Sequence, residues 1–276
     1  RRREYKENKI IMKIAMAQTD VEQGDIKKNI LKVDNFASRA KKEGADLIVF
    51  PEMFVCGFDY KKNMEFLESN SGSIEEMLCK IAKKHSISLC GSIPHLCPES
   101  DLATNRFIFI DDSGKIVSHY DKIHLFSVFN EDKYVKAGDE IVVADTKFGK
   151  IGFAVCYDIR FPDIFVRMTK RGAKLIIISA AFPHPRSEHW RILSRARAIE
   201  NQCFIVAVNR GGTEKFGNNQ VKYFGMSAII DPWGGIVAEC PEDAADDIAI
   251  ADVNLDEIDT IRTQIPSLKD RREDLY

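Results

Sequence analysis

Short apolar runs alternate with amphipathic stretches along this chain of 276 residues. The pattern predicts a mostly buried first strand over residues 10–18. Apolar side chains then recur every three or four residues from Ile26 to Ala40, which predicts a helix with one buried face. Residues 47–50 are continuously apolar, as is typical of a central strand in a parallel sheet. The beginning of the chain therefore predicts a strand, a helix and a second strand.

The same alternation continues to the end of the chain, with turn sequences at residues 111–114 and 231–235 between neighbouring strands. Strands that alternate with helices, with hairpins between them, predict an α/β fold with a mixed sheet. Further helices are predicted over residues 73–85, 162–171 and 187–201, with a short one after the last strand. Further strands are predicted over residues 87–93, 106–110, 115–120, 141–144, 151–156, 175–179, 204–208, 226–230, 236–239 and 248–253.

One short sequence occurs twice in similar form. Residues 42–48 and 170–176 are identical at five of seven positions, and both have the pattern of a helix end, a glycine and a buried strand. The repeat fits two similar halves, and it also fits the chance recurrence of a common junction. Because no linker rich in proline, glycine or serine separates the halves, we expect residues 10–276 to form a single domain. Residues 1–9 are highly charged and are expected to be a flexible leader.

The overall composition, with 45% hydrophobic and 30% charged residues, is typical of a globular protein. The net charge of −2 indicates neither a nucleic-acid partner nor an anionic membrane surface, and no apolar run approaches the ~20 residues of a membrane span. The six histidines form no recognisable metal motif, so we expect no metal. The seven cysteines are widely spaced without a CxxC pair, which favours reduced thiols in a cytoplasmic protein.

One cysteine stands at a special position. Residues 151–156 predict a strand that ends at Cys156, a polar cluster follows, and Pro162 suits the first turn of the next helix. Open α/β sheets bind ligands at the C-terminal ends of their strands, and a nearby helix N-terminus lowers the pKa of a thiol. Cys156 is therefore a candidate nucleophile, although most free cysteines are simply small buried hydrophobic residues.

Two other residues suit the partners of a nucleophile. Glu52 directly follows the predicted strand at residues 47–50, where partial burial would raise the pKa of its carboxyl group and suit it to act as a general base. Lys122 follows a predicted hairpin, and a fixed ammonium group can stabilise an oxyanion. Taken alone, each of these residues is better explained as a solvated surface residue.

Three motifs together resemble those of the nitrilase superfamily of carbon–nitrogen hydrolases. They are PE at residues 51–52, YDKIHLF at residues 120–126 and CYDIRFP at residues 156–162. The similarity extends over residues 10–276 and includes DPWG at residues 231–234. The resemblance implies a four-layer α-β-β-α sandwich with mixed sheets. It also implies that subunits pair through their outer helices, as a homodimer or a higher homo-oligomer.

The same resemblance implies a Glu–Lys–Cys catalytic triad, which falls on Glu52, Lys122 and Cys156. Relatives carry a further glutamate in the loop after the lysine, and the matching residue is Glu131. In the implied chemistry Cys156 attacks an amide carbon while Glu52 moves the protons. Lys122 and the backbone N–H of Tyr157 hold the oxyanion. Water then hydrolyses a thioester acyl-enzyme, and no metal or organic cofactor takes part.

Arg160 lies four residues after Cys156, so its guanidinium group could bind a substrate carboxylate in bidentate fashion. It resembles the carboxylate-binding arginine of carbamoyl-amino-acid hydrolases and ω-amidases. The alternative is an internal ion pair with Asp158 or Asp163. A carboxylate bound at Arg160 would lie beyond the scissile amide.

Aromatic residues complete the predicted site. Phe126, Tyr157 and Phe182 are candidates for an apolar pocket wall, although core packing explains them nearly as well. AAFP at residues 180–183 is one of several details that resemble ω-amidases, which hydrolyse the distal amide of short dicarboxylate monoamides such as 2-oxoglutaramate and succinamate. The leading hypothesis is therefore an ω-amidase with a small-molecule amide as its substrate. The alternatives are an N-carbamoyl-amino-acid amidohydrolase, another amidase or nitrilase, and a non-catalytic binding protein on the same scaffold.

Overall fold

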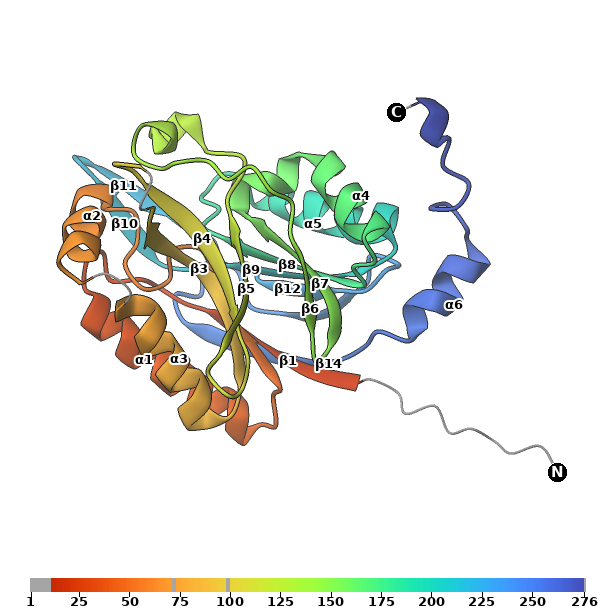
Figure 1. Ribbon diagram of the computed structural model, residues 1–276, viewed down its shortest axis with the longest axis horizontal. Helices are drawn as coiled ribbons and strands as arrows, with labels where there is room; N and C mark the ends of the chain where they lie inside the picture. The colour runs from red at the N-terminus through yellow and green to blue at the C-terminus, as the bar shows by residue number, and fades with distance from the viewer. Residues whose placement is uncertain (1–10, 71–72, 98–99, 276) are drawn as a thin grey trace.

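Two six-stranded mixed sheets form the centre of the molecule (Figure 1). The computed structural model describes residues 11–70, 73–97 and 100–275, so the predicted leader at residues 1–9 and the predicted strand start at residue 10 lie outside the described residues. The first sheet has the order β14 (Asp247–Asn254), β1 (Ile11–Gln18), β2 (Leu47–Val49), β3 (Ser88–Leu96), β4 (Ala103–Ile110), β5 (Ile116–Asp121). The second sheet has the order β13 (Ile236–Glu239), β12 (Ala228–Ile230), β9 (Phe204–Asn209), β8 (Leu175–Ala180), β7 (Gly149–Val155), β6 (Val143–Thr146).

Helices cover the outer face of each sheet, so the molecule has four layers in the order α-β-β-α (Figure 1). Helices α1 (Ile26–Lys42) and α3 (Ser73–His85) pack on the first sheet. Helices α4 (Pro162–Lys170) and α5 (Ser187–Asn201) pack on the second. The expected α/β sandwich with mixed sheets is therefore confirmed.

The inner faces of the two sheets pack against each other through aromatic side chains. Phe107 and Phe109 of β4 stack on Phe153 of β7, with ring centroids 4.6 and 6.1 Å apart. Burying one phenylalanine side chain stabilises a fold by roughly 1.5–3 kcal/mol. The same buried cluster continues to Cys156, so this packing fixes where the strand ends of the two sheets meet.

The two sheets repeat one arrangement. Strands β1, β2 and β3 are parallel, as are β7, β8 and β9, and antiparallel strands flank both triplets. Residues 42–48 lead from α1 into β2, and residues 170–176 lead from α4 into β8, so the two similar sequences occupy equivalent junctions. Gly44 and Gly172 have φ angles of 82° and 98° there, a conformation that glycine adopts at little cost. The structure therefore favours two similar halves over chance recurrence.

The sequence prediction misses one helix, α2 (Tyr60–Ser69), and one hairpin, formed by β10 (Thr213–Phe216) and β11 (Asn219–Lys222). In α2 only Asn63 and Leu67 are buried, so its sequence shows no continuous apolar stripe. The strands of the hairpin are four residues long and mostly exposed, so they lack the alternation that marks a half-buried strand.

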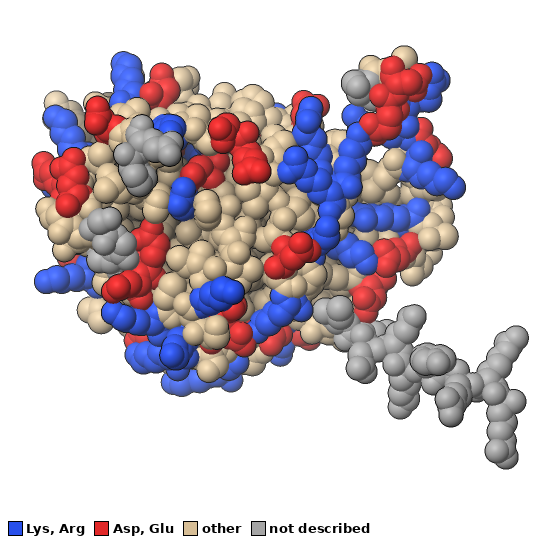
Figure 2. Space-filling model, viewed as in Figure 1, with Lys and Arg blue, Asp and Glu red and all other residues tan. Residues whose placement is uncertain are grey.

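The remaining elements lie around the sandwich. The chain continues through α6 (Glu257–Gln264), and Lys170 of α4 pairs with Glu273 near its end. No helix in the described part of the chain is long and apolar enough to cross a membrane. Figure 2 shows acidic and basic side chains interspersed over the face in view. Among the described residues there are also four 3-10 helices: η1 (Ser127–Phe129), η2 (Glu131–Lys133), η3 (Cys156–Arg160) and η4 (Glu273–Leu275).

Candidate active site

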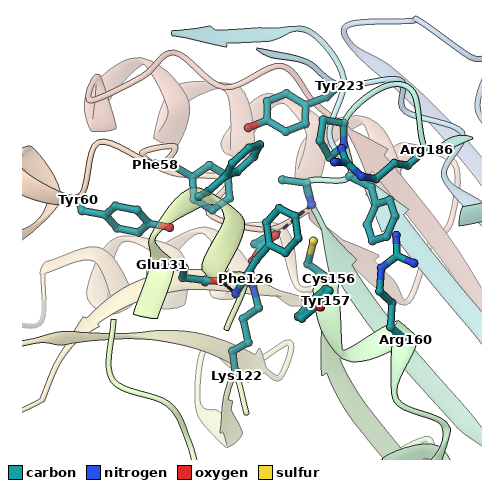
Figure 3. Close-up of a pocket in the computed structure, with 15 residues that line it drawn as sticks. Phe58, Tyr60, Lys122, Phe126, Glu131, Cys156, Tyr157, Arg160, Arg186 and Tyr223 are labelled. Atoms are coloured by element: carbon teal, nitrogen blue, oxygen red, sulfur yellow. Dashed lines mark hydrogen bonds and ion pairs between the residues drawn. The ribbon is translucent and has the colours of Figure 1, made fainter. Parts of the chain in front are cut away.

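The three residues predicted as a triad line one cavity between the ends of the two sheets (Figure 3). Glu52 follows β2 and Lys122 follows β5, so both come from the first sheet. Cys156 follows β7 of the second sheet and begins η3. Glu131, at the start of η2, lines the same cavity. The structure therefore brings together four residues that are far apart in the sequence.

Two carboxylates hold the ammonium group of Lys122. Its Nζ atom donates to Oε1 of Glu52 at 2.8 Å and to the two carboxylate oxygens of Glu131 at 3.0 and 2.8 Å. The side chains of Lys122 and Glu52 are only 2% and 1% exposed. Buried charges are tolerated when hydrogen bonds satisfy them, and these contacts fix the ammonium group in one position.

The charges in this cluster shift one another's protonation. Burial raises the pKa of Glu52 above its ordinary value of 4.5, with a further contribution from Glu131 and opposition from Lys122. Burial alone would lower the pKa of Lys122, but Glu131 and Glu52 raise it well above its ordinary value. Lys122 therefore stays protonated at neutral pH, and Glu52 is a stronger base than an exposed carboxylate.

Cys156 has an unusual backbone and a protonated thiol. Its φ angle of 46° lies in the left-handed region, which costs a non-glycine residue about 1–3 kcal/mol. Burial raises the pKa of the thiol well above its ordinary value, Glu52 raises it further, and Lys122 opposes the shift. The pKa reduction expected from a helix N-terminus is therefore wrong for this thiol. Its nucleophilic form requires a base, and the hydrogen-bonded Glu52 carboxylate is in place to be that base.

Asp158 holds the turn that presents Cys156, and sequence reasoning did not assign it this part. Its fully buried carboxylate accepts from the backbone N–H of Val155 at 2.8 Å and from the hydroxyl of Tyr120 at 2.7 Å. The Nδ1 atom of His124 lies 2.8 Å from the same carboxylate. These contacts tie the turn after β7 to the residues on either side of Lys122.

Asn105 is a second residue that the sequence analysis missed. It lies on β4 and is fully buried, and its Nδ2 atom donates to Glu52 at 2.8 Å and to Glu131 at 3.2 Å. The other oxygen of Glu52 accepts from the backbone N–H of Ala181 at 3.1 Å. Asn105 alternates in the sequence with Phe107 and Phe109, so an asparagine in phase with two inward-facing phenylalanines is the signal that could have indicated this role.

The cavity is open to solvent, and its empty volume is about 480 Å³ with the open mouth included. Its wall is largely aromatic. All eight residues predicted for the site, Phe126 included, are part of the lining, and their roles in catalysis and binding stay predictions. The lining consists of Glu52, Phe58, Tyr60, Lys122, Phe126, Phe129, Glu131, Cys156, Tyr157, Arg160, Ala181, Phe182, Pro183, Arg186 and Tyr223.

Arg160 reaches the cavity wall beside Phe182. Its guanidinium carbon lies 5.3 Å from the centre of the Phe182 ring, and its Nη2 atom lies 3.2 Å from Nδ1 of His189. Within the described residues, Arg160 forms no ion pair with either of the neighbouring carboxylates at 158 and 163. The alternative of an internal ion pair is therefore not what the structure contains.

A buried ion pair supports the opposite part of the wall. The Nη1 atom of Arg210 donates to Oε2 of Glu214 at 2.5 Å, and both side chains are fully buried. The carboxylate of Glu214 also accepts from the hydroxyl of Tyr223 at 3.1 Å and from the backbone N–H of Phe58 at 2.6 Å. One glutamate in the unpredicted hairpin thus fixes two aromatic lining residues. No pattern in the sequence indicated this.

Comparisons with known proteins identify the family of this chain. The carbon-nitrogen hydrolase family model matches residues 13–263. The 2-oxoglutaramate amidase of Bacillus subtilis (strain 168) is 36% identical over 263 residues, which cover 95% of this chain and 98% of that protein. The deaminated glutathione amidase of Dictyostelium discoideum is 34% identical over 266 residues, which cover 90% of each chain.

A solved structure extends the agreement to three dimensions. Nit3 of Saccharomyces cerevisiae, a member of branch 10 of the nitrilase superfamily, has a TM-score of 0.84 with this chain at 30% identity. The match covers 95% of this chain and 97% of Nit3. By its family match, its relatives and its fold, this chain belongs to the carbon–nitrogen hydrolase family of the nitrilase superfamily and is a hydrolase.

Proposed function

We propose that this enzyme is an ω-amidase, which hydrolyses a short dicarboxylate monoamide such as 2-oxoglutaramate or succinamate to the dicarboxylate and ammonia. The observation that carries the proposal is that Arg160 lines the same cavity as Cys156. A guanidinium group can hold the carboxylate at one end of a substrate while the amide at the other end meets the thiol. The relative named 2-oxoglutaramate amidase supports the same class of substrate.

The first half of the proposed reaction forms a thioester. Glu52 takes the thiol proton of Cys156, and the sulfur attacks the amide carbon. The carbonyl oxygen becomes an oxyanion, which the ammonium group of Lys122 and the backbone N–H of Tyr157 stabilise. Collapse of this intermediate breaks the carbon–nitrogen bond, and Glu52 gives its proton to the departing nitrogen. Ammonia leaves, and the acyl group stays on the sulfur.

The second half releases the acid. Glu52, ionised again, takes a proton from a water molecule, and the resulting hydroxide attacks the thioester carbon. The same donors stabilise the second oxyanion. The carbon–sulfur bond then breaks, the proton returns to the sulfur, and the dicarboxylate leaves. Glu131 holds Lys122 in position. Atoms and charges balance without a metal ion or an organic cofactor.

A comparison of substrates tests the proposal. We expect ammonia release from 2-oxoglutaramate and succinamate to exceed release from N-carbamoyl amino acids and simple nitriles by at least about tenfold in kcat/KM. The monoamides place an ordinary amide carbon opposite a carboxylate, whereas the carbamoyl carbon lies between two electron-donating nitrogens and a simple nitrile has neither the carbonyl oxygen nor the carboxylate. Deaminated glutathione belongs in the same series because a relative acts on it by name. Turnover of another compound with none of either monoamide would refute the ω-amidase assignment.

We also propose that the enzyme forms a homodimer or a higher homo-oligomer through α5. Ile192 and Ile199 on this helix are 60% and 50% exposed, and Trp233 in the neighbouring turn is 52% exposed. Arg195 of α5 donates to the carbonyl of Gly234 at 2.8 Å, so the helix and the turn lie side by side. Grouped apolar side chains of this kind mark interfaces.

Light scattering checks the oligomer. We expect a mass of at least twice 31.3 kDa for the wild type, and a smaller species when Ile192 and Ile199 are both replaced with glutamate. A wild type that stays monomeric at micromolar concentration would contradict the proposal.

The seven free cysteines support the cytoplasm as the location, which cell fractionation can test.

A further inference from the structure

The charges that line the cavity are not balanced by one another. The charged lining residues are Glu52, Lys122, Glu131, Arg160 and Arg186. Lys122 is hydrogen-bonded to both glutamates, so these three groups form one cluster. Two guanidinium groups remain, and both share the cavity with aromatic walls.

Neither of these arginines has a carboxylate partner in the described part of the chain. Arg160 contacts the ring nitrogen of His189 and the face of Phe182. Arg186 lines the cavity without a side-chain hydrogen bond or ion pair to any described residue. Among the other buried or partly buried arginines, Arg106 pairs with Asp121, Arg197 with Glu200 and Arg210 with Glu214, while Arg262 donates to the backbone carbonyls of Gln202 and Ala173. Two unpaired cations in one cavity therefore suit an anionic ligand.

Arg186 is held by its backbone at the entrance to α5. Its N–H donates to the carbonyl of Pro183 at 3.3 Å, and its carbonyl accepts from the N–H of Trp190 at 3.1 Å. Figure 3 shows Arg160 and Arg186 on the same side of Cys156, with Glu131 and Tyr60 on the other side. A substrate that extends from the thiol in this direction approaches both guanidinium groups.

We propose that Arg186 is a second substrate-binding residue, which shares the distal carboxylate of the substrate with Arg160. The inference rests on the proposed function. A carboxylate offers about four acceptor positions on two oxygens, so it can accept from two guanidinium groups at once. Two nearby cations repel each other until an anion lies between them, so the pair favours substrates with a carboxylate over neutral amides of the same length.

A pair of matched substrates isolates this role. Succinamate and succinamide have the same length, but only succinamate carries a charge. We expect Arg186→Ala to lower kcat/KM for succinamate 10- to 100-fold, mainly through a higher KM, because a contact made in both ground and transition states is lost. For succinamide the initial rate of ammonia release should change less than about threefold. Arg186→Lys keeps the charge without the planar fork, so its kcat/KM for succinamate should lie between those of the wild type and Arg186→Ala.

Arg191→Ala is the matched control, because Arg191 lies on α5 outside the cavity lining and contacts Glu239 at 3.7 Å. This variant should release ammonia from both substrates at the wild-type rates. Two results would overturn the role of Arg186 without affecting the proposed function. In the first, Arg186→Ala lowers the rates of ammonia release from succinamate and succinamide by the same factor. In the second, the wild type hydrolyses succinamate and Arg186→Ala leaves its kcat/KM unchanged. A wild type that releases ammonia from neither succinamate nor 2-oxoglutaramate overturns this role together with the proposed function.

Discussion

Replacing Cys156 with alanine is expected to abolish amide hydrolysis, with a loss of roughly 10⁴- to 10⁶-fold in kcat. The side chain reaches the cavity from the end of β7, and without its sulfur no thioester can form. Ammonia release from 2-oxoglutaramate measures the loss. Mass spectrometry adds an independent readout, because the wild type mixed with a slowly hydrolysed amide should carry one acyl group on Cys156 and the variant none.

Two controls separate loss of chemistry from loss of fold. Alanine has the same backbone strain as cysteine at this φ angle, so the variant should melt within about 5 °C of the wild type. Cys79→Ala removes another free thiol that is partly exposed and lies on α3, and it should keep full activity. Unchanged turnover in a folded Cys156→Ala variant would refute the nucleophilic role.

The second large effect is expected from Glu52→Gln, which should lower kcat about 10²- to 10⁴-fold. Glutamine keeps the size of the side chain and can still accept a hydrogen bond from Lys122, but it cannot take a proton from the thiol. Because burial raises the pKa of Cys156, little thiolate exists at neutral pH without that base. Rates measured across pH identify the group. The wild-type kcat/KM should fall as the pH drops through the pKa of Glu52. Because this pKa is raised, the fall should begin above pH 4.5.

Glu131→Gln provides the comparison that fixes the sign. The negative charge of Glu131 contributes to the raised pKa of Glu52, so removing it favours the ionised form of Glu52 and lowers that pKa. The acidic limb of the kcat/KM profile should therefore move to lower pH, while the overall rate falls because Lys122 loses a charged partner. A limb that stays in place or moves to higher pH, or a Glu52→Gln variant with the wild-type profile, would show that another group is the base.

Most strands and helices could be predicted because their apolar patterns are strong. The run at residues 47–50 and the buried run in β8 mark central strands because both faces of a parallel sheet are covered. The amphipathic period from Ile26 marks α1 because one face of that helix packs on the sheet. The pairing of strands into two separate sheets came from the resemblance, since local patterns do not specify which distant strands become neighbours.

Some site residues could also be predicted from local patterns, and others could not. The strand-end positions of Glu52 and Cys156 were visible as polar residues directly after apolar runs. Asn105, Asp158 and Glu214 were not identified, because their roles depend on contacts across β4, η3 and the β10–β11 hairpin that no local spacing reveals. The high pKa of the Cys156 thiol could not be predicted from the sequence either. Burial raises this pKa, and the burial arises only when the surrounding layers pack around the thiol.

The division of the reacting groups between the two sheets has one more consequence. The first half of the chain contributes Glu52, the proposed base, and Lys122, and the second half contributes Cys156, the proposed nucleophile. A misplacement of about 1 Å in such a site can cost roughly a hundredfold in rate. The stacked rings of Phe107, Phe109 and Phe153 thus act as an alignment device: they hold two half-sites in register, and neither half could perform the reaction on its own.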